Sequence, residues 1–250
     1  MRASQHLNHR VKKYSTLLLG TLAAFGVSAA TAVADGITIT DVTGHQVTLD
    51  APAERVILGE GRQIYLLGLL EPQDPFAHVV GWREDFAQAD PDNYARYLER
   101  FPEIEAIPTF GGFKDGTFDV EQAASLNPDV VLMNIEAKAA TEDAAYDEKL
   151  AQLGIPIVYV DFREDPIAHT IPSMRIIGQI IGDEEKAEAF IDFAESELAR
   201  VTDVIAEANP ERPSVFIDRA GGYSDECCMS FGPANFGDYV TLAGGSNIAE

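Results

Sequence analysis

The sequence predicts an α/β fold: one lobe with a largely parallel sheet, then a single long helix, then the start of a second α/β lobe. Three observations support this prediction. Short apolar runs alternate with stretches of helical spacing between residues 37 and 182. The run at 156–162, PIVYVDF, is apolar almost throughout, which is typical of a strand buried on both faces. An amphipathic stretch of unusual length then follows at 183–209.

The long helix is predicted to end at Pro210, which cannot continue the hydrogen-bond ladder. Its apolar residues recur at steps of three and four and form one stripe: Ala187, Phe190, Ile191, Ala194, Leu198, Val201, Ile205 and Ala208. At 1.5 Å per residue the helix is about 40 Å long, roughly the width of a small domain. We interpret it as a connector between two lobes; an ordinary surface helix of one domain is the alternative.

Residues 1–34 have the features of a cleavable signal peptide. Arg2, Arg10 and Lys12 lie in a basic segment, an apolar core follows at 17–27, and the small-x-small triplet at 32–34 is a cleavage site. The apolar core is too short to span a bilayer comfortably. The mature chain is therefore expected to start near Asp35 in the periplasm, and a retained membrane anchor is the alternative.

The composition restricts the function classes. The formal net charge is −23, and removal of the basic leader makes it more negative. Because phosphate backbones require a positive field, nucleic acid is excluded as a partner. The only cysteines, Cys227 and Cys228, are adjacent. Their redox state stays open between a vicinal disulfide, an interchain bond and free thiols.

The first lobe is expected to span 35–182. It starts with a β-hairpin at 37–49, where polar and apolar residues alternate around Thr43-Gly44. Further strands are expected at 55–58, 78–82, 129–133 and 156–162. Helices are expected after Gly59, near 94–101, before Pro128, over 142–153 and up to Ile181, where Pro172 starts or kinks the last one. Residues 107–118 form a glycine-rich loop.

The second lobe is expected to begin at 210, with a strand at 213–219 and a helix near 236–243. A lobe comparable to the first would need roughly another 80 to 120 residues. The given sequence stops at Glu250, so we expect it to be a fragment whose second lobe, 210–250, is incomplete.

Three arginines follow the carboxyl ends of predicted strands: Arg62, Arg83 and Arg219. Ligands of open α/β sheets bind at that edge, so these arginines are candidate ligand-binding residues. Surface arginines paired with the many carboxylates of this chain are the alternative for each of them.

Aromatic residues lie in or next to the same loops. The candidate wall of a site for a bulky anionic ligand consists of Trp82, Tyr94, Phe113 and Tyr223, since aromatic rings with a few arginines suit such a molecule. The segment GEGRQI resembles a dinucleotide fingerprint, but Ile64 occupies the place of its third glycine.

Catalysis is poorly supported. The sequence has no G-x-S-x-G elbow, and His45, His78 and His169 lie far apart along the chain. A metal site would need these histidines to converge. We therefore predict no catalytic residues, no protein-bound metal and no cofactor.

Several segments together resemble the helical-backbone class of periplasmic substrate-binding proteins, which serve ABC importers of ferric siderophores, haem and cobalamin. These segments are the hairpin with the following strand, DVEQAASLNPDVVLM, IPIVYVD, RIIGQIIGDEEKAEAF with the long helix, and AGGSNIA. The resemblance implies two Rossmann-like lobes joined by one helix, a ligand held between them, and delivery to a membrane permease. A monomeric binding protein is expected.

The resemblance also implies residue roles. Glu121 matches the first-lobe glutamate that docks onto permease arginines, and its second-lobe counterpart would lie beyond Glu250. The double-cysteine loop resembles that of carriers of iron complexes and favours a ferric siderophore. Haem or cobalamin is the alternative, with Tyr65, Tyr94 or Tyr223 as a haem ligand. An enzyme on a related two-lobed scaffold is a further alternative, which would need a convergent catalytic set.

Overall fold

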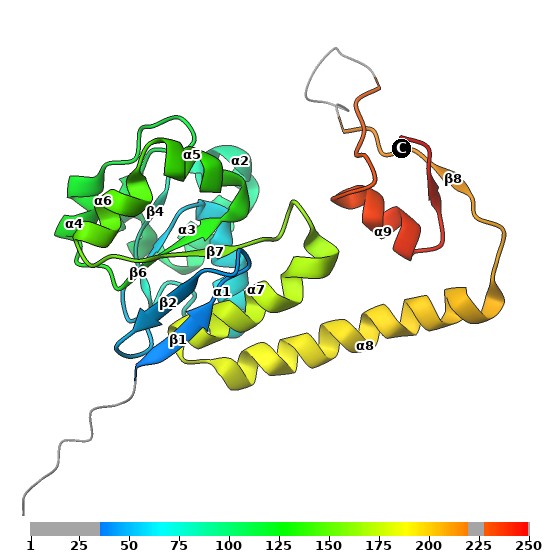
Figure 1. The fold of residues 1–250 in the computed structure, drawn as a ribbon, viewed down its shortest axis with the longest axis horizontal. Coiled ribbons are helices and arrows are strands. Elements are labelled where there is room, and N and C mark those ends of the chain that lie inside the picture. The colour runs from blue at the N-terminus through cyan, green and yellow to red at the C-terminus, as the bar shows by residue number, and fades with distance from the viewer. Residues whose placement is uncertain (1–35, 220–227, 250) are drawn as a thin grey trace, which may run out of the picture. The chain divides into compact units, whose positions relative to one another are not determined.

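The computed structural model describes residues 36–219 and 228–249, and Figure 1 shows their arrangement. The predicted signal peptide lies outside the described residues. The described chain starts with the expected hairpin, in which β1 (Ile37–Thr40) and β2 (Gln46–Leu49) pair antiparallel. The buried carboxylate of Asp41 accepts hydrogen bonds from the backbone N–H groups of Thr43, at 2.9 Å, and Tyr159, at 3.1 Å. This carboxylate therefore ties the hairpin to the main sheet.

The main sheet is parallel and has five strands in the order β5-β4-β3-β6-β7. Its strands are β3 (Val56–Leu58), β4 (Val79–Arg83), β5 (Thr109–Phe110), β6 (Val130–Asn134) and β7 (Ile157–Val160). The chain moves outward from β3 to β5, returns to β6 beside β3, and then moves outward the other way. This is the doubly wound order of a Rossmann-like sheet, and it confirms the predicted α/β class with a parallel sheet.

Helices cover both faces of this sheet. They are α1 (Ile64–Leu70), α2 (Asp85–Ala89), α3 (Pro91–Arg100), α4 (Val120–Ser125), α5 (Lys138–Asp143), α6 (Tyr146–Gln152) and α7 (Pro166–Ile181). Val56 and Leu58 of β3 pack in a core with α1 and α7, whereas Ile57 packs in a second core with α4 and α6. Successive side chains of a strand point to opposite faces, so an all-apolar strand requires two cores.

Several predicted elements differ in the structure. The helix expected at 142–153 is α6, which begins only at Tyr146, and the unpredicted α5 precedes it; Ala145 between them adopts a left-handed conformation with φ 53°. Tyr146 then packs against Phe113 and Phe118 in the core. The loop after β4 contains the unpredicted α2, which is held by the buried ring of Phe86, and the glycine-rich loop begins with β5.

The helix before Gly182 starts at Pro166, and Pro172 lies inside it. Gly182 adopts φ 76° and ends α7, and α8 (Glu184–Ala208) begins after Asp183. The predicted long helix is thus confirmed within one residue at each end.

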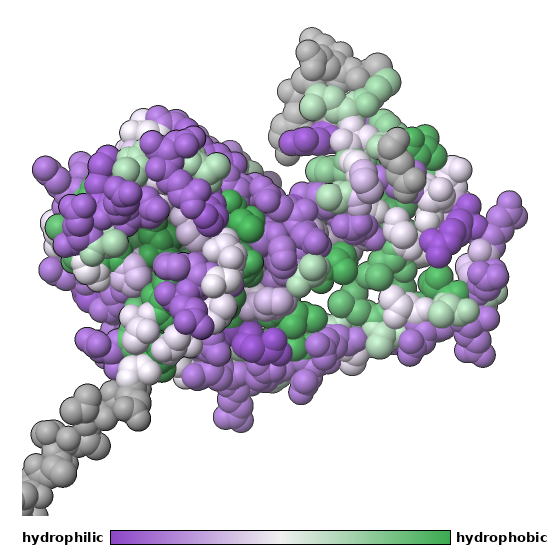
Figure 2. Space-filling view, viewed as in Figure 1, coloured by the Kyte–Doolittle hydropathy of each residue, from purple (hydrophilic) through white to green (hydrophobic). Residues whose placement is uncertain are grey.

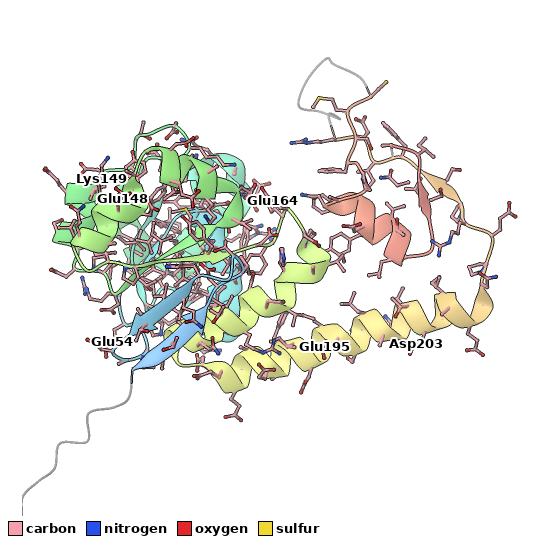
Figure 3. All side chains as sticks on the ribbon, viewed as in Figure 1. Glu54, Glu148, Lys149, Glu164, Glu195 and Asp203 are labelled. Atoms are coloured by element: carbon pink, nitrogen blue, oxygen red, sulfur yellow. The ribbon has the colours of Figure 1, made fainter. Side chains whose placement is uncertain are left out.

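The two halves of α8 differ in packing. A Cβ atom at Gly178 of α7 would lie 2.5 Å from the Cβ of Ala187, so the two helices approach closely there. Ile191 is also buried, whereas Val204 is 59% exposed. Figure 2 shows apolar surface along α8, and Figure 3 shows the charged residues Glu195 and Asp203 on the same helix. The stripe that the sequence predicts is therefore buried mainly in its first half.

After α8 the chain forms β8 (Ser214–Val215), α9 (Phe236–Leu242) and β9 (Ser246–Asn247), with β8 and β9 parallel. The strand expected at 213–219 is much shorter, and Phe216 is exposed beyond its end. Ile205 of α8 packs against this segment at Gly244. The described residues belong to one compact unit, 34–250, so its division at 183–209 into lobes and connector stays a prediction. None of the described helices combines the length and apolarity needed to cross a bilayer.

Candidate functional site

The candidate site lies where β3 and β6 meet and their following turns diverge, at the carboxyl edge of the parallel sheet. This position is the topological switch point of a doubly wound sheet, where such folds bind ligands. The turn after β3 lies tightly against its neighbours. A Cβ atom at Gly59 would lie 2.6 Å from Met133 Sδ, and one at Gly61 would lie 2.6 Å from the carbonyl oxygen of Arg83. Only glycine fits these two positions without movement of the neighbouring strands.

A network of buried polar side chains occupies this switch point. Asn134, at the end of β6, donates a hydrogen bond of 2.5 Å to Glu60 Oε2. The side-chain amide of Gln63 donates to Asn134 Oδ1 at 3.1 Å, and Gln63 Oε1 accepts from the backbone N–H of Glu60 at 3.2 Å. All three side chains are buried. The turns after β3 and β6 are therefore fixed to each other by satisfied polar groups.

Two arginines flank the Glu60 carboxylate. Arg62 lies 2.6 Å from Glu60 Oε1, and Arg163, from the turn after β7, forms an ion pair with Glu60 Oε2. Burial raises the pKa of Glu60 above its ordinary value, and the charges of Arg163 and Arg62 oppose that shift. The carboxylates of Asp85 and Glu136 lie 3.7 Å from Arg62 and 3.1 Å from Arg163, respectively. Both arginine side chains are more than one-third exposed, although the Nε atom of Arg62 is buried, so carboxylates orient groups that solvent still reaches.

Asp161 positions the turn that carries Arg163. Its carboxylate accepts hydrogen bonds from the backbone N–H groups of Arg163, Glu164 and Asp165, each at 2.9 Å. Burial disfavours its charged form, but these bonds and the one from His169 outweigh that effect and lower the pKa of Asp161. Figure 3 shows Glu164 on this turn, between β7 and α7.

Arg83 ends β4 on the neighbouring side of the switch point. Its Nη2 atom would lie 2.9 Å from a Cβ at Gly112, so the guanidinium rests against the backbone of the glycine-rich loop. The Arg83 charge also helps to lower the pKa of Asp115 in that loop, after the larger contribution of the Thr117 hydroxyl. In contrast to Arg62 and Arg163, Arg83 forms no ion pair with any residue of the described ranges.

Two residues of the predicted aromatic wall are buried. Trp82 is 2% exposed and packs edge-on against Phe76 and Phe86. Phe113 is 3% exposed and stacks on Phe118 with ring centroids 3.9 Å apart. Both rings pack against other aromatic rings in the hydrophobic cores, and neither faces solvent in this structure.

The remaining predicted residues lie elsewhere. Arg219 is exposed after β8, with its guanidinium 5.4 Å from the centre of the Phe231 ring. Tyr223 and Cys227 lie outside the described residues. Glu121 is exposed in the first turn of α4, whose N-cap is Asp119. The structure thus brings Arg62 and Arg83 to one sheet edge and leaves Arg219 on the later segment.

Sequence reasoning missed Glu60, Asn134 and Arg163. A signal for them was present, since each follows the carboxyl end of a predicted strand, as Arg62 does. The sequence does not single out Glu60, because the chain has 41 Asp and Glu residues against 18 Lys and Arg. Only the strand order brings the ends of β3, β6 and β7 together.

One histidine lies beside the site and contacts a buried carboxylate. His169 Nδ1 lies 2.7 Å from Asp161 Oδ2, and the hydroxyl of Ser173 contacts the backbone of Asp161 rather than the imidazole. These contacts join α7 to the turn after β7, and the three side chains lack the serine–histidine contact of a nucleophilic triad. Within the described ranges, no group of three or more metal-binding side chains converges. The hydroxyl of Tyr65, a possible haem ligand in the sequence, donates to Asp90 at 2.5 Å, and burial with this bond raises its pKa to about 12.

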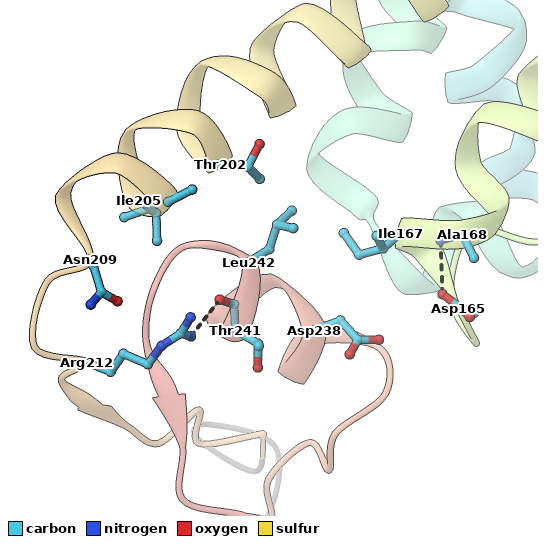
Figure 4. A pocket seen from close by; sticks show the side chains of 11 residues that line it. Asp165, Ile167, Ala168, Thr202, Ile205, Asn209, Arg212, Asp238, Thr241 and Leu242 are labelled. Atoms are coloured by element: carbon cyan, nitrogen blue, oxygen red, sulfur yellow. Dashed lines mark hydrogen bonds between the residues drawn. The ribbon is translucent and has the colours of Figure 1, made fainter.

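A separate pocket of about 560 Å³ lies between the start of α7, the end of α8 and α9, and Figure 4 shows it from close by. Ile167, Ile205 and Leu242 supply apolar walls. Arg212 donates hydrogen bonds to the carbonyl oxygens of Thr241 and Gly245, both at 3.3 Å. This arginine therefore ties the start of the later segment to its last helix and strand.

Comparison with known proteins agrees with this architecture. The family model of the periplasmic binding protein matches residues 85–250, which is more than half of the chain. A search of curated proteins found no match.

Solved structures give the same fold. FepB, a TroA-like periplasmic binding protein from Veillonella parvula, aligns with a TM-score of 0.77 and 31% identity, over 85% of this chain and 62% of its own. The molybdate-bound MolA from Haemophilus influenzae aligns with a TM-score of 0.64 and 16% identity, over 85% and 66%. The siderophore binding protein BauB, bound to acinetobactin and ferric iron, aligns with a TM-score of 0.60 and 16% identity, over 85% and 67%.

The last two similarities concern the fold alone. The chain spans between 62% and 67% of the length of these three structures. The family match, the doubly wound parallel sheet and the long helix that follows it agree with one another. The chain belongs to the periplasmic binding protein family.

Proposed function

We propose that this protein is the solute-binding component of an ABC importer, that it works in the periplasm without catalysis, and that its cargo is a ferric siderophore. The observation that carries the proposal is the set of arginines at the carboxyl edge of the sheet, in a chain of this family. The likeness to the FepB structure, at 31% identity, supports the same class of protein.

Arg83 is the proposed primary anion contact. Arg83 forms no ion pair within the described ranges, although its charge acts on Asp115 from a greater distance, so its donors are open to a ligand, whereas Arg62 and Arg163 share theirs with Glu60. Ferric siderophores carry oxygen donors and often a negative charge, which planar bidentate guanidinium groups bind well. Arg62 and Arg163 are proposed to line the same edge with fixed orientation, since Glu60 holds both.

Residues that precede α8 in the sequence and residues that follow it are both proposed to contact the cargo. Arg219 and Tyr223 follow β8 in the sequence and are proposed to contact the ligand from the second lobe. Trp82 and Phe113 are proposed to act indirectly, by fixing the end of β4 and the glycine-rich loop on the core. Glu121 is proposed to dock on the permease, because its carboxylate is exposed at the start of α4.

The experiment is an equilibrium titration of the purified protein with separate candidate cargoes. Catecholate, hydroxamate and carboxylate ferric siderophores, haem, cobalamin and molybdate are each added, and heat and the fluorescence of Trp82 are recorded. We expect saturable binding of one ferric siderophore class. Saturable binding of haem, cobalamin or molybdate alone would overturn the proposed cargo, and binding of none would overturn the proposed function.

A further inference from the structure

A second pocket, remote from the carboxyl edge, lies between the end of α1 and α3. Its volume is about 320 Å³, at the lower end of the range for small-molecule sites. Gly68 and Pro72 line it on one side, and Arg96, Tyr97 and Arg100 of α3 line it on the other. We call it the α1–α3 pocket.

The charge of the α1–α3 pocket is opposite to that of the protein. The chain has a net charge of −23, yet both charged residues that line this pocket are arginines. Arg96 and Arg100 are one helical turn apart on α3, so their side chains lie on the same face. Neither forms an ion pair with a residue of the described ranges, although several other arginines of this acidic chain do. The pocket therefore offers two uncompensated guanidinium groups.

Arg100 is held in place by neutral contacts. Its Nη2 atom donates to the carbonyl oxygen of Pro72 at 3.2 Å, and its guanidinium carbon lies 5.1 Å from the centre of the Phe101 ring. A carbonyl and an aromatic ring orient the group without neutralising its charge. An anion in the pocket would meet a positioned cation.

The rest of the lining is mostly apolar. Pro72, Pro75 and Phe101 supply its walls, and Pro75 and Phe101 belong to the buried part of the lobe. The hydroxyl of Tyr97 faces Gly68, and burial raises the pKa of Tyr97, so this group stays a hydrogen-bond donor. Arginines beside apolar walls suit a carboxylate that carries a ring or a short hydrocarbon body.

Gly68 keeps the pocket open. A glycine inside a helix lowers helix stability by about 0.5–1 kcal/mol relative to alanine, and Gly68 lies in the interior of α1. A Cβ atom there would lie 3.2 Å from the Tyr97 hydroxyl and 3.7 Å from Pro75 Cγ. The φ angle of Gly68 is in the ordinary range, so the backbone conformation does not require glycine. The missing side chain instead leaves space beside Tyr97.

We propose that the α1–α3 pocket binds a small organic carboxylate with an apolar body, through Arg96 and Arg100, at a site separate from the cargo edge. The probe for this class is benzoate, compared with acetate, which has the charge without the ring, and with benzyl alcohol, which has the ring without the charge. Binding to the full chain is followed by saturation-transfer NMR and calorimetry.

We expect benzoate to bind saturably, and acetate and benzyl alcohol to bind at least about tenfold more weakly, because each lacks one half of the recognition. Arg96→Gln and Arg100→Gln should each weaken benzoate binding by about tenfold. Arg200→Gln, on the exposed surface of α8, is the matched control and should leave it unchanged. Gly68→Ala should weaken binding while the protein unfolds at the same or a higher temperature.

Three results would overturn the proposal. They are absence of saturable benzoate binding, equal binding of benzyl alcohol, and equal affinity of Arg96→Gln, Arg100→Gln and Arg200→Gln. The three arginines are exposed, so their substitution by glutamine should leave the protein folded. Circular dichroism of each variant checks that the fold is kept.

Discussion

Arg163 forms an ion pair with Glu60, and this contact joins the turn after β7 to the turn after β3, 103 residues earlier in the chain. The Glu60 side chain is buried, whereas Arg163 is 39% exposed. The pair thus connects the polar network of the switch point to the surface where a ligand is proposed to bind. It also makes the stability of this edge depend on pH.

Arg163→Gln should destabilise the protein more at neutral pH than at acid pH. Burial raises the pKa of Glu60, and Arg163 is the largest opposing influence. For a carboxyl whose folded pKa is raised, stability falls as the pH rises from the ordinary value of 4.5 through the folded value. Removal of the Arg163 charge should raise the folded pKa of Glu60 further, so the stability of the variant should fall over a wider pH range.

We expect a loss of about 1–3 kcal/mol in the free energy of unfolding near pH 7.5, and a smaller loss near pH 4.5, measured in urea. Arg200→Gln is the control. Equal losses at both pH values would contradict the role assigned to Glu60.

Asp161→Asn should loosen the turn that carries Arg163. The two carboxylate oxygens accept three backbone hydrogen bonds, whereas asparagine has a single acceptor oxygen and cannot keep all three, so we expect a loss of about 2 kcal/mol at pH 7. The pKa of Asp161 is lowered in the folded state. Its contribution is therefore present above the ordinary value of 3.8 and lost as the pH falls through the folded value.

The difference between Asp161→Asn and the unaltered protein should thus shrink below about pH 4 in urea titrations. Asp203→Asn, on the exposed surface of α8, should show no such difference at any pH. A constant difference across the pH range would count against the charge of Asp161 as its cause.

Gly59→Ala should destabilise the switch point through steric overlap. The added methyl group would lie 2.6 Å from Met133 Sδ and 2.9 Å from the carbonyl oxygen of Leu132. Overpacking of this kind costs about 1–3 kcal/mol. Gly232→Ala, where no atom lies within 4 Å, is the matched control. Thermal unfolding of both variants compares them, and equal midpoints would refute the close approach.

Ile191→Ala and Val204→Ala should separate the two halves of α8. Ile191 is buried in the core that α1 and α7 form with the main sheet, so its truncation should lower the free energy of unfolding by about 2–4 kcal/mol. Val204 is mostly exposed, and its truncation should change stability by less than about 0.5 kcal/mol. Chemical denaturation measures both. Similar losses would show that the second half of the helix is packed in solution.

Local patterns in the sequence were sufficient for most of the fold. The apolar runs located β3, β4, β6 and β7, and the stripe from Ala187 with Pro210 located α8. Predictions failed where tertiary contacts decide the outcome. Ala145 breaks a helix of good local propensity so that Tyr146 reaches the core, and the sequence carries no signal for that.

The site was predictable in part. The rule that ligands bind at carboxyl ends of strands placed Arg62 and Arg83 at one edge. The same rule gave Trp82 a place there, but the register of β4 against β3 shifts between Val79 and Gly81, and the Trp82 ring lies in the core beside Phe86. Strand order, which no single segment encodes, was needed to bring Arg163 to Glu60.

The most direct test of the account is the affinity of Arg83→Gln for the ferric siderophore that the unaltered protein binds, with Arg200→Gln as the control. Loss of a charge-assisted contact predicts an affinity at least about tenfold weaker for Arg83→Gln, no change for Arg200→Gln, and unchanged thermal unfolding of both. Equal affinity of the two variants and the unaltered protein would contradict binding at the carboxyl edge of the sheet.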